Sequence, residues 1–523
     1  DTILDFDDMA CANIAGKFTA PVLFLLLASC ILHRASAAQR PNIVLLLADD
    51  LGYADLNFLP QSPPDISTPN LDRLAKSGLY FTEAYATSPI CSPSRVGLIT
   101  GRYQQRWGNY WYGQGGLPKS ELTLPQFLAK NGYSTKKIGK THTNGGLAAH
   151  PLDHGFEEFL GFLGHTKDYT RLSARDVKAY GAKNARAAHI GPLERNRGQM
   201  TSYENDYSTD IFTNEAVEFI SRDHKKKPFY LHLAYNAVHH PTYLNKPAYA
   251  AKFGIQDPLW NRDKKPWEFP YWDPDQETYR VWHKKWGHLG AVDPLGRKRY
   301  LASLHGLDLS VGRVLDALDR KGLTRNTIIV FLSDNGGTIN TYSNNSPLRG
   351  YKYMFGEGGI RIPMIISWPN TLPNGRTADG LVSAMDIFPT LAELIGAKAP
   401  DKLDGKSFRA LLSWDTTILP APPHQELCWS DGKKDWVIRS GPWKLINSSG
   451  WDHEFYKLDQ GTAKPAPNYK YPAGLLLFNL ENDVAETTNL AAKHPARVKE
   501  LQAAYQKWRA QMGKPVPGTR TPK

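Results

Sequence analysis

The stretch Asn42-Ile43-Val44-Leu45-Leu46-Leu47-Ala48, followed at once by Asp49-Asp50-Leu51-Gly52, decides the fold class. A short apolar run that stops abruptly at polar residues is typical of a strand buried on both faces of a parallel sheet. We interpret three similar runs as further buried parallel strands, and helical stretches separate them. The chain is therefore predicted to be α/β, with a large mixed, mainly parallel sheet sandwiched by helices. The further strands are expected at 229–235, 327–332 and 363–368, and the helices at 68–77, 123–131, 213–221 and 300–321.

The pattern of predicted secondary structure changes at Pro420. A Pro-rich loop is followed by hairpin-like segments at 427–429, 435–440 and 443–446, and then by a last amphipathic helix. Four apolar residues fall on one face of that helix, namely Val498, Leu501, Tyr505 and Trp508. We predict a small α+β C-terminal subdomain at 420–523, a catalytic α/β domain at 38–419, and a leader at 1–37.

The leader contains an uncharged apolar run from Ala20 to Leu32, preceded by Lys17 and followed by Ala35-Ser36-Ala37. This order is typical of a secretory signal peptide, cleaved here before Ala38, and the run is too short to span a bilayer comfortably. In the alternative, Leu27-Ala28-Ser29-Cys30 is a lipobox and Cys30 carries a lipid anchor. Both alternatives predict an exported protein, either periplasmic or extracellular.

Composition excludes several classes of protein. The 523 residues are 41% hydrophobic and 22% charged, with four cysteines, which rules out a disulfide scaffold, a coiled coil and a disordered chain. The formal net charge is +12, and removing residues 1–37, with four acids and two bases, raises it to +14. A basic exported protein suits polyanionic partners. No nucleic-acid motif accompanies the charge, so sulfated or phosphorylated polymers are favoured over nucleic acid.

Polar residues follow three of the predicted strands, within four positions of the strand end. Asp49 and Asp50 follow the first, Asp334 and Asn335 follow another, and His239 follows a third. The carboxyl ends of parallel strands share one sheet edge, so these side chains are expected to converge. Carboxylate and amide oxygens suit Ca²⁺, with Mg²⁺ as the alternative. Helix capping and turns are the other explanation for such residues, but two such pairs at one edge, with three carboxylates, would crowd like charges that a cation relieves.

Only two cysteines lie beyond the leader, Cys91 and Cys428, and a disulfide between them is one interpretation. The segment from Cys91 to Arg102 gives another, because it resembles the type I sulfatase signature C-x-P-S-R-x-x-x-L-T-G, with Ile99 in place of Leu. This resemblance implies that a formylglycine-generating maturase oxidises Cys91 to formylglycine, which leaves no thiol for a disulfide.

The same segment predicts a helix. Pro93 suits a helix start, and Ser92 is expected to cap it, which would put residue 91 at the positive end of the helix. Arg95 lies one turn further on and is expected to face the same side, where it would hold the modified residue or an anion.

The resemblance continues from Pro41 to about Leu490. Residues 139–142 (GKTH) are similar to G-K-W-H with Thr141 in place of Trp, and 237–241 (AVHHP) are similar to A-P-H-x-P. Residues 347–352 and 357–363 resemble P-L-R-G-x-K and E-G-G-x-R-x-P. The resemblance implies catalytic roles for Cys91, Arg95, Lys140, His142, His239 and Lys352. It implies a metal site formed by Asp49, Asp50, Cys91, Asp334 and Asn335.

A type I sulfatase is a hydrolase of sulfuric esters, so the implied substrate is a sulfated small molecule, such as an aryl sulfate, or a sulfated glycan. In the implied mechanism the hydrated aldehyde at residue 91 attacks sulfur, and His239 or Lys352 protonates the leaving alcohol. His142 then removes a proton so that sulfate is expelled. Two alternatives stay open: a phosphate or phosphonate monoester hydrolase of the same superfamily, and an inactive binder of sulfated glycans.

Two groups of aromatic residues accompany these motifs. Their rings could stack on sugars beside basic groups, or could pack internally as part of a lid, and both interpretations stay open. One group follows the signature, at Tyr103, Trp107, Tyr110, Trp111 and Tyr112, and the other lies at Trp260, Trp267, Tyr271, Trp272, Tyr279, Trp282 and Trp286.

Overall fold

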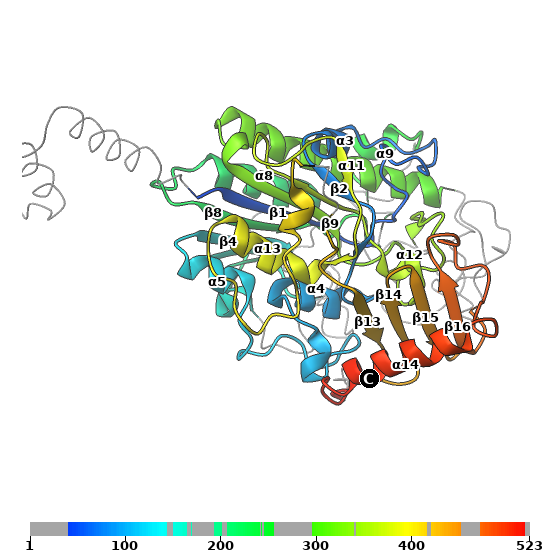
Figure 1. Cartoon of the computed structure of the whole chain (residues 1–523). Coiled ribbons are helices and arrows are strands. Elements are labelled where there is room, and N and C mark those ends of the chain that lie inside the picture. The colour runs from blue at the N-terminus through cyan, green and yellow to red at the C-terminus, as the bar shows by residue number, and fades with distance from the viewer. Residues whose placement is uncertain are drawn as a thin grey trace, which may run out of the picture. The chain divides into compact units, whose positions relative to one another are not determined.

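A ten-stranded sheet forms the centre of this computed structural model (Figure 1). The predicted leader and the second aromatic group lie outside the described residues. The strand order in the sheet is β11-β2-β10-β9-β1-β8-β4-β5-β6-β7. The structure describes residues 40–143, 150–164, 169, 193–200, 207–240, 242, 245–255, 295–338, 341–415, 420–450 and 471–517.

The strands of this sheet have the following bounds: β1 Asn42–Ala48, β2 Leu79–Phe81, β4 Ser134–Lys140, β5 Glu158–Phe162, β6 Glu194–Arg195, β7 Gly198–Gln199, β8 Phe229–Ala234, β9 Thr327–Ser333, β10 Met364–Ser367 and β11 Arg376–Ala378. A small second sheet pairs β3 (Ala84–Tyr85) with β12 (Val382–Ser383). The α-helices are α3 Pro69–Lys76, α4 Cys91–Thr100, α5 Leu124–Lys130, α8 Ser208–Ser221, α9 Pro247–Ala251, α11 Gly296–Arg320, α12 Glu357–Ile360, α13 Ile387–Leu394 and α14 Pro495–Arg509. Short 3-10 turns lie at Gln104–Trp107, Pro151–His154, Thr324–Asn326, Ala384–Asp386 and Arg409–Leu412.

The predicted strand β1 lies between β8 and β9 and runs parallel to both. Every residue of β1 is buried, as expected for a strand covered on both faces. β4 and β5 extend the parallel set beyond β8. The predicted α/β class and the mainly parallel sheet are therefore confirmed.

One strand direction was predicted wrongly. The run at 363–368 was expected to be parallel, but β10 pairs antiparallel with β9 and with β2. An apolar run looks the same in both directions, and direction depends on the connection that precedes it. Here the connection from β9 contains only the short helix α12 and no long crossover helix among its described residues.

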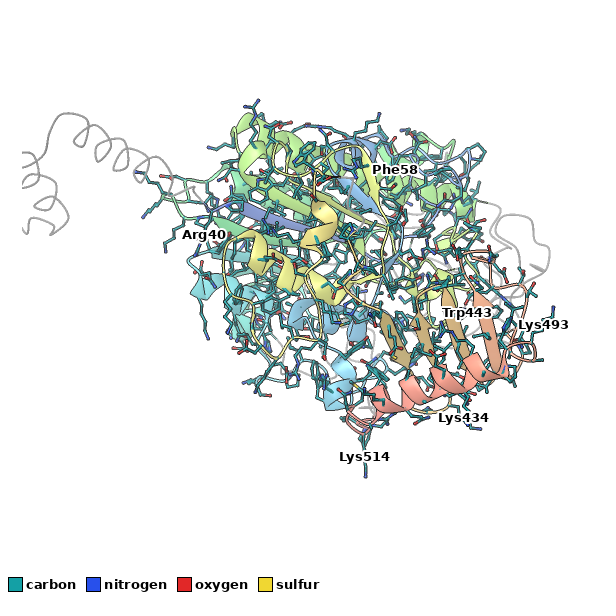
Figure 2. All side chains as sticks on the ribbon, in the orientation of Figure 1. Arg40, Phe58, Lys434, Trp443, Lys493 and Lys514 are labelled. Atoms are coloured by element: carbon teal, nitrogen blue, oxygen red, sulfur yellow. The ribbon has the colours of Figure 1, made fainter. Side chains whose placement is uncertain are left out.

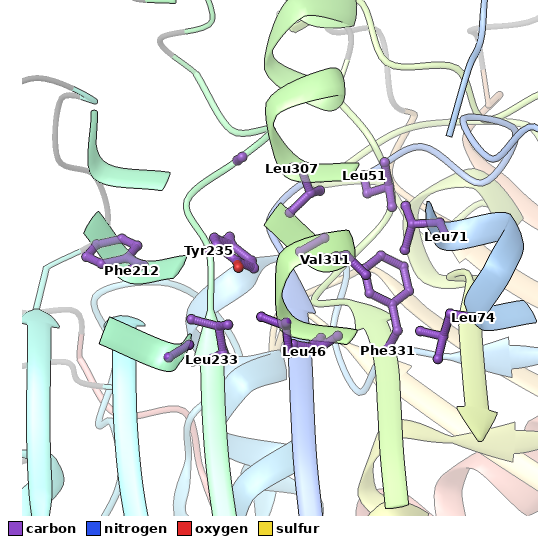
Figure 3. Packing of buried hydrophobic residues seen from close by; sticks show 14 of the residues in the cluster. Leu46, Leu51, Leu71, Leu74, Phe212, Leu233, Tyr235, Leu307, Val311 and Phe331 are labelled. Atoms are coloured by element: carbon purple, nitrogen blue, oxygen red, sulfur yellow. The ribbon is translucent and has the colours of Figure 1, made fainter. Parts of the chain in front are cut away.

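Helices cover both faces of the sheet (Figure 1). On one face α3, α8 and α11 pack against the strands, and on the other face α4, α5 and α13 do so. Figure 3 shows the first of these layers, in which side chains from three helices meet side chains from three parallel strands. The residues are Leu71, Leu74, Phe212, Leu307 and Val311 on the helices, and Leu46, Leu233 and Phe331 on the strands.

The predicted C-terminal element is a four-stranded antiparallel sheet, in the order β13-β14-β15-β16. Helix α14 packs on it through Val498, Leu501 and Tyr505, and the ring of Tyr505 stacks on Trp436 with centroids 4.1 Å apart. The predicted hairpin segments and the apolar face of the last helix are thus confirmed, while the division at residue 420 stays a prediction. The strand bounds are β13 Glu426–Ser430, β14 Trp436–Ser440, β15 Trp443–Ser448 and β16 Gly474–Asn479.

A buried ion pair joins this sheet to the main part of the molecule. The ammonium of Lys444 on β15 lies 2.8 Å from Glu357 on α12 and 2.8 Å from Glu486. The side chains of all three residues are fully buried. Burial raises the pKa of Glu357 on its own, but the nearby cations, Lys444 foremost, bring it down to about 2.

Basic side chains lie on the surface near the C-terminal end of the described chain. Lys434, Lys493 and Lys514 are exposed around the C-terminal sheet and α14, as Figure 2 shows. Among the described helices, none is both long enough and apolar enough to cross a bilayer.

Candidate active site

The carboxyl ends of β1, β8 and β9 meet as predicted, and backbone hydrogen bonds hold the segments that follow them. The Asp334 N–H donates to the Ala48 carbonyl at 3.1 Å, and the Asp49 N–H donates to the Ala237 carbonyl at 3.0 Å. Asp49, Asp50, Asp334 and Asn335 are all at most 2% exposed. Polar residues that follow separate strands are therefore brought to one buried site.

This acidic group has the chemistry of a cation site. Oxygen atoms of Asp49 and Asp50 lie within 4.8 Å of each other, of the Cys91 sulfur and of a ring nitrogen of His239. Buried Oδ1 atoms of Asp49 and Asn335 accept no hydrogen bond, which leaves hard donors available for a divalent cation. Asp334 Oδ1 also faces this group, since it accepts from the Asp50 N–H at 3.3 Å. The residues present therefore fit Ca²⁺ or Mg²⁺.

Three buried cations face these carboxylates. Lys140, the last residue of β4, pairs with Asp49, and Lys352 lies 2.8 Å from Asp50 Oδ1. Arg95 donates from Nε to Asp334 Oδ2 at 2.7 Å and from Nη1 to the Lys140 carbonyl at 3.2 Å. Burial alone would lower the pKa of Lys352, but the carboxylate of Asp50 raises it well above its usual range, so Lys352 stays protonated.

Cys91 is the first residue of α4 and is 3% exposed. Burial raises the pKa of its thiol to about 11, against the influence of Lys140 and Lys352, so the unmodified residue is a poor nucleophile at neutral pH. Cys91 and Cys428 are both free. The predicted cap is wrong: the helix begins at Cys91 itself, Ile90 is the cap residue, and the Ser92 hydroxyl has no hydrogen-bond partner.

The two histidines differ in their surroundings. His239 Nε2 lies 3.6 Å from Asp50 Oδ2, and Nδ1 donates to the His240 carbonyl at 2.6 Å. Burial lowers the pKa of His239 well below its usual range, and Lys352 and Lys140 lower it further. His142 is half-buried and lies two residues beyond the end of β4. Its backbone N–H donates to the Leu163 carbonyl at 3.1 Å.

Sequence patterns did not reveal the residues that hold these segments in place. The Asn345 amide accepts from the N–H groups of Tyr53 and Gly337, and donates to the carbonyls of Gly337 and Gly350. It thereby ties the segment after β9 to the turn that precedes Lys352. Asn345 stands in a polar stretch, SNNSP at 343–347, whose composition indicates only a turn.

Tyr169 plays a similar part for His239. Its hydroxyl contacts the carbonyls of Asn236 and His239, each at 2.8 Å. No motif marks Tyr169, because the contact spans 70 positions of sequence.

The aromatic group after the signature divides into two parts. Tyr103 and Tyr110 are buried and pack internally, whereas Tyr112 is 58% exposed. Trp111 lies between Tyr112 and Tyr353, with ring centroids 6.5 and 6.3 Å away. Tyr353 is 39% exposed, follows Lys352 directly and has the Lys352 ammonium 5.6 Å from its ring centroid. An aromatic surface thus lies beside the site. Tyr353 was missed in the sequence because it lies about 240 positions from Trp111, outside both aromatic groups.

Buried carboxylates, three cations and the start of a helix meet at one edge of a mostly parallel sheet. This arrangement is typical of hydrolases that act on small anionic esters, and its oxygen donors fit a divalent cation. The sulfatase family profile matches residues 41–397, and the chain belongs to this family of sulfuric ester hydrolases.

Known proteins of this family resemble the chain along much of its length. The N-acetylgalactosamine-6-sulfatase of Mus musculus is 32% identical over 407 residues, which cover 74% of this chain and 68% of the relative. A sulfatase of Formosa agariphila is 29% identical over 555 aligned positions, which cover 92% of this chain and 90% of the relative. The chain spans about two thirds of the length of the mammalian N-acetylgalactosamine-6-sulfatases it matches.

Solved structures show the same fold. The crystal structure of Ps i-CgsB has a TM-score of 0.72 and 31% sequence identity, covering 91% of this chain and 94% of that chain. The same protein has been solved in complex with k-i-k-neocarrahexaose.

Proposed function

We propose that this chain hydrolyses sulfate monoesters of carbohydrates, with formylglycine derived from Cys91 as nucleophile and Ca²⁺, or alternatively Mg²⁺, as the bound cation. One observation carries the proposal: the Cys91 sulfur lies within 4.8 Å of oxygen atoms of Asp49 and Asp50 and of a nitrogen of His239. The sulfur stands where the oxygens of a hydrated aldehyde would stand after oxidation. Asp49, Asp50, Asp334 and Asn335 would hold the cation, together with residue 91.

The bound cation would neutralise charge on the ester and favour the ionised form of the nucleophile. The chain's own residues supply the rest. Arg95, Lys140 and Lys352 would place positive charge around the sulfate, which otherwise repels an attacking oxygen. Arg95 is fixed for this role because Asp334 and the Lys140 carbonyl accept two of its N–H groups.

One hydroxyl oxygen of residue 91 would form a bond to sulfur while the bond from sulfur to the alcohol oxygen breaks. His239 or Lys352 would give the departing alcohol its proton. Lys352 is protonated beside Asp50, whereas the lowered pKa of His239 leaves its ring neutral with Nδ1–H directed at the His240 carbonyl, which supports Lys352 as the donor. His142 would take the proton from the second hydroxyl of residue 91. The oxygen of that hydroxyl would then reform the carbonyl as the bond between the carbon and the sulfated oxygen breaks. Sulfate leaves, and no water attacks sulfur. A serine lacks the second hydroxyl and could not complete this step.

Carbohydrate substrates are supported by three observations. One similar structure contains an oligosaccharide, k-i-k-neocarrahexaose, and one similar relative is named for a sulfated N-acetylgalactosamine. The third is the aromatic surface of Trp111, Tyr112 and Tyr353 beside Lys352, because sugar rings stack on exposed aromatic faces. The same surface would accept an aryl sulfate.

Export and maturation complete the proposal. The leader at 1–37 would direct the chain to the periplasm or the exterior, through cleavage before Ala38 or, alternatively, through lipid attachment at Cys30. A formylglycine-generating maturase would act on Cys91.

The test begins with mass spectrometry of the peptide that contains residue 91, from protein produced together with a maturase. We expect an aldehyde in place of the thiol. Turnover of an aryl sulfate, an aryl phosphate and an aryl phosphonate is then compared, with the sulfate expected to be the fastest. Cys91→Ala should abolish turnover, whereas Cys428→Ala, at the other buried free cysteine, should retain it. Full activity of Cys91→Ala would overturn the assignment of the nucleophile, and preference for phosphonate would overturn the substrate class.

A further inference from the structure

The segment that carries Lys352 is held from the C-terminal part of the chain. Glu486 lies beyond β16, its side chain is fully buried, and its Oε2 accepts from the backbone N–H of Glu357 at 2.8 Å. Its main-chain carbonyl accepts from Nη1 of Arg349 at 2.6 Å. Arg349 and Glu357 flank Lys352 in the sequence, so one residue binds both ends of the Lys352 segment (residues 349–357).

The backbone of Glu486 has an unusual conformation. Its φ is +53°, in the left-handed region that disfavours residues with a Cβ atom. In this conformation the carbonyl reaches Arg349 while the carboxylate reaches Glu357. A backbone conformation that glutamate disfavours persists only where the surrounding contacts fix it, and such residues gather at functional sites. The contacts around Glu486 are therefore the next question.

The carboxylate of Glu486 has two further partners. Oε2 also accepts from the Tyr471 hydroxyl at 2.7 Å, and Oε1 lies 2.8 Å from the Lys444 ammonium. Lys444 pairs with Glu357 as well, so one ammonium lies between two buried carboxylates. Three donors from separate parts of the chain thus fix one side chain, and that side chain caps the N–H of Glu357 in turn.

The Lys352 segment is also bonded to the centre of the candidate site. The Lys352 N–H donates to the Gly337 carbonyl at 3.0 Å, and the Tyr353 N–H donates to the Pro89 carbonyl at 2.8 Å. Pro89 stands two residues before Cys91, the first residue of α4. The position of this segment therefore sets where the Lys352 side chain starts relative to the other site residues.

We propose that Glu486 is a positioning residue of the active site, which fixes the Lys352 segment and thereby holds the Lys352 ammonium against Asp50. The inference rests on the proposed function, because Lys352 is the group through which Glu486 would affect hydrolysis. Glu486 would touch neither the ester nor the cation. The competing explanation is that Glu486 only stabilises the join between the C-terminal sheet and the rest of the molecule.

Glu486→Gly is the most informative variant. Glycine adopts a φ near +53° readily, so the change removes the carboxylate and keeps the carbonyl to which Arg349 donates. Lys444 keeps its pair with Glu357, so no buried ammonium is left without a carboxylate. We expect kcat/KM for an aryl sulfate to fall by about 10–10²-fold, measured well below the unfolding midpoint, because a small displacement of a catalytic group has an effect of this size.

Glu215→Ala is the control for a general loss of stability. Glu215 is also a buried carboxylate with two cationic partners, Lys136 and Arg195, and these partners lie outside the Lys352 segment. This variant should lower the unfolding midpoint and keep kcat/KM. An equal loss of kcat/KM in Glu215→Ala and Glu486→Gly would overturn the proposal in favour of a purely stabilising role.

A double-mutant cycle with Lys352→Met shows whether Glu486 acts through Lys352. When the positioned ammonium is already absent, Glu486→Gly should reduce kcat/KM by no more than about threefold. The two losses would then be strongly non-additive. A reduction as large as that measured in the wild-type background would overturn the proposal.

Hydrogen exchange tests the positioning without relying on sulfatase activity. A peptide spanning 348–355 contains the amides of Lys352 and Tyr353, whose acceptors are main-chain carbonyls and not Glu486. We expect Glu486→Gly to speed exchange in this peptide by about tenfold, and Glu215→Ala to leave it unchanged.

A second variant covers the case in which Glu486→Gly does not fold. Glu486→Asp keeps the charge beside Lys444 and suits the left-handed conformation, but its shorter side chain does not reach the Glu357 N–H. It should show the same faster exchange. Unchanged exchange in the variant that folds would overturn the proposal. A wild-type protein that hydrolyses no sulfate ester would instead overturn the proposed function, and the exchange result would stand apart from it.

Discussion

The ammonium of Lys352 lies 2.8 Å from Oδ1 of Asp50, and both side chains are at most 3% exposed. The residues are 302 positions apart in the chain. In this pair a proposed sulfate-binding cation neutralises a proposed metal ligand. Charge balance at the site is therefore built in before any cation or ester arrives, and the pair is a direct target for mutation.

Removal of this cation should impair catalysis. We expect Lys352→Met to lower kcat/KM for an aryl sulfate by about 10²–10⁴-fold, because it removes positive charge beside the ester and one of two proton donors. Steady-state kinetics at saturating Ca²⁺ provide the measurement. Lys398→Met, at an exposed lysine paired with Asp401, is the control and should leave the rate unchanged. Equal rates for both variants would exclude Lys352 from the site.

Removal of the divalent cation should abolish activity and leave the fold intact. In the structure Lys140, Lys352 and Arg95 already balance Asp49, Asp50 and Asp334, so the protein without the cation does not hold an uncompensated acidic cluster. We expect treatment with a chelator to stop turnover while the circular dichroism spectrum is kept, and added Ca²⁺ or Mg²⁺ to restore turnover. Undiminished turnover after exhaustive chelation would contradict the metal site.

Gly139 should tolerate no side chain. Its φ is +89°, and an added Cβ would lie 1.9 Å from the carbonyl oxygen of Ala234 on β8. Gly139→Ala should therefore push β4 away from β8, displace Lys140 and destabilise the protein by roughly 3 kcal/mol or more. Gly132→Ala is a matched control, because Gly132 has a similar φ of +86° but open space around it. This substitution should lower the free energy of unfolding by about 1 kcal/mol. Thermal unfolding of the two variants separates the steric clash from the backbone conformation.

Stability should depend on pH through Glu215. Burial alone would raise the pKa of Glu215, but hydrogen bonds from Arg195 and Lys136 bring it down to about 2. A carboxylate with a lowered pKa stabilises the fold fully above its unfolded pKa and loses that contribution as pH falls toward the folded value. We expect Glu215→Gln to cost about 2 kcal/mol at pH 7, with the difference from wild type narrowing between pH 5 and pH 2.

Urea unfolding across that pH range checks this expectation. Glu218→Gln is the control on the same helix, since Glu218 is 63% exposed and pairs only with Arg222 among the described ion pairs. Its effect should be small at every pH. A constant difference between Glu215→Gln and wild type from pH 7 to pH 2 would refute the assigned role.

Sequence patterns anticipated the longer strands whose burial is complete. The strands β1, β8 and β9 were recognised because each is a continuous apolar run that ends at polar residues. The direction of β10 was not anticipated, because direction is set by the path of the connecting chain. Short edge strands such as β6 and β7 also left no signal, since two residues show no periodicity.

The residues of the candidate site likewise divide into those that could be predicted from sequence and those that could not. Residues at strand ends could be grouped from sequence, because a parallel sheet brings its carboxyl ends together. Asn345 and Tyr169 could not, because their contacts depend on where loops fold back in three dimensions. The start of α4 was misplaced for a related reason: Ser92 is a residue type that often caps helices, but the helix begins at Cys91, two residues before the predicted start at Pro93.

The bond between Lys444 and Glu357 sets an order of events during synthesis. Lys444 comes 87 positions after Glu357, so the ribosome delivers the carboxylate long before its counter-ion. Until Lys444 emerges, the carboxylate of Glu357 on α12 lacks this counter-ion. The bond that joins α12 to the C-terminal sheet can therefore form only after β15 has been made.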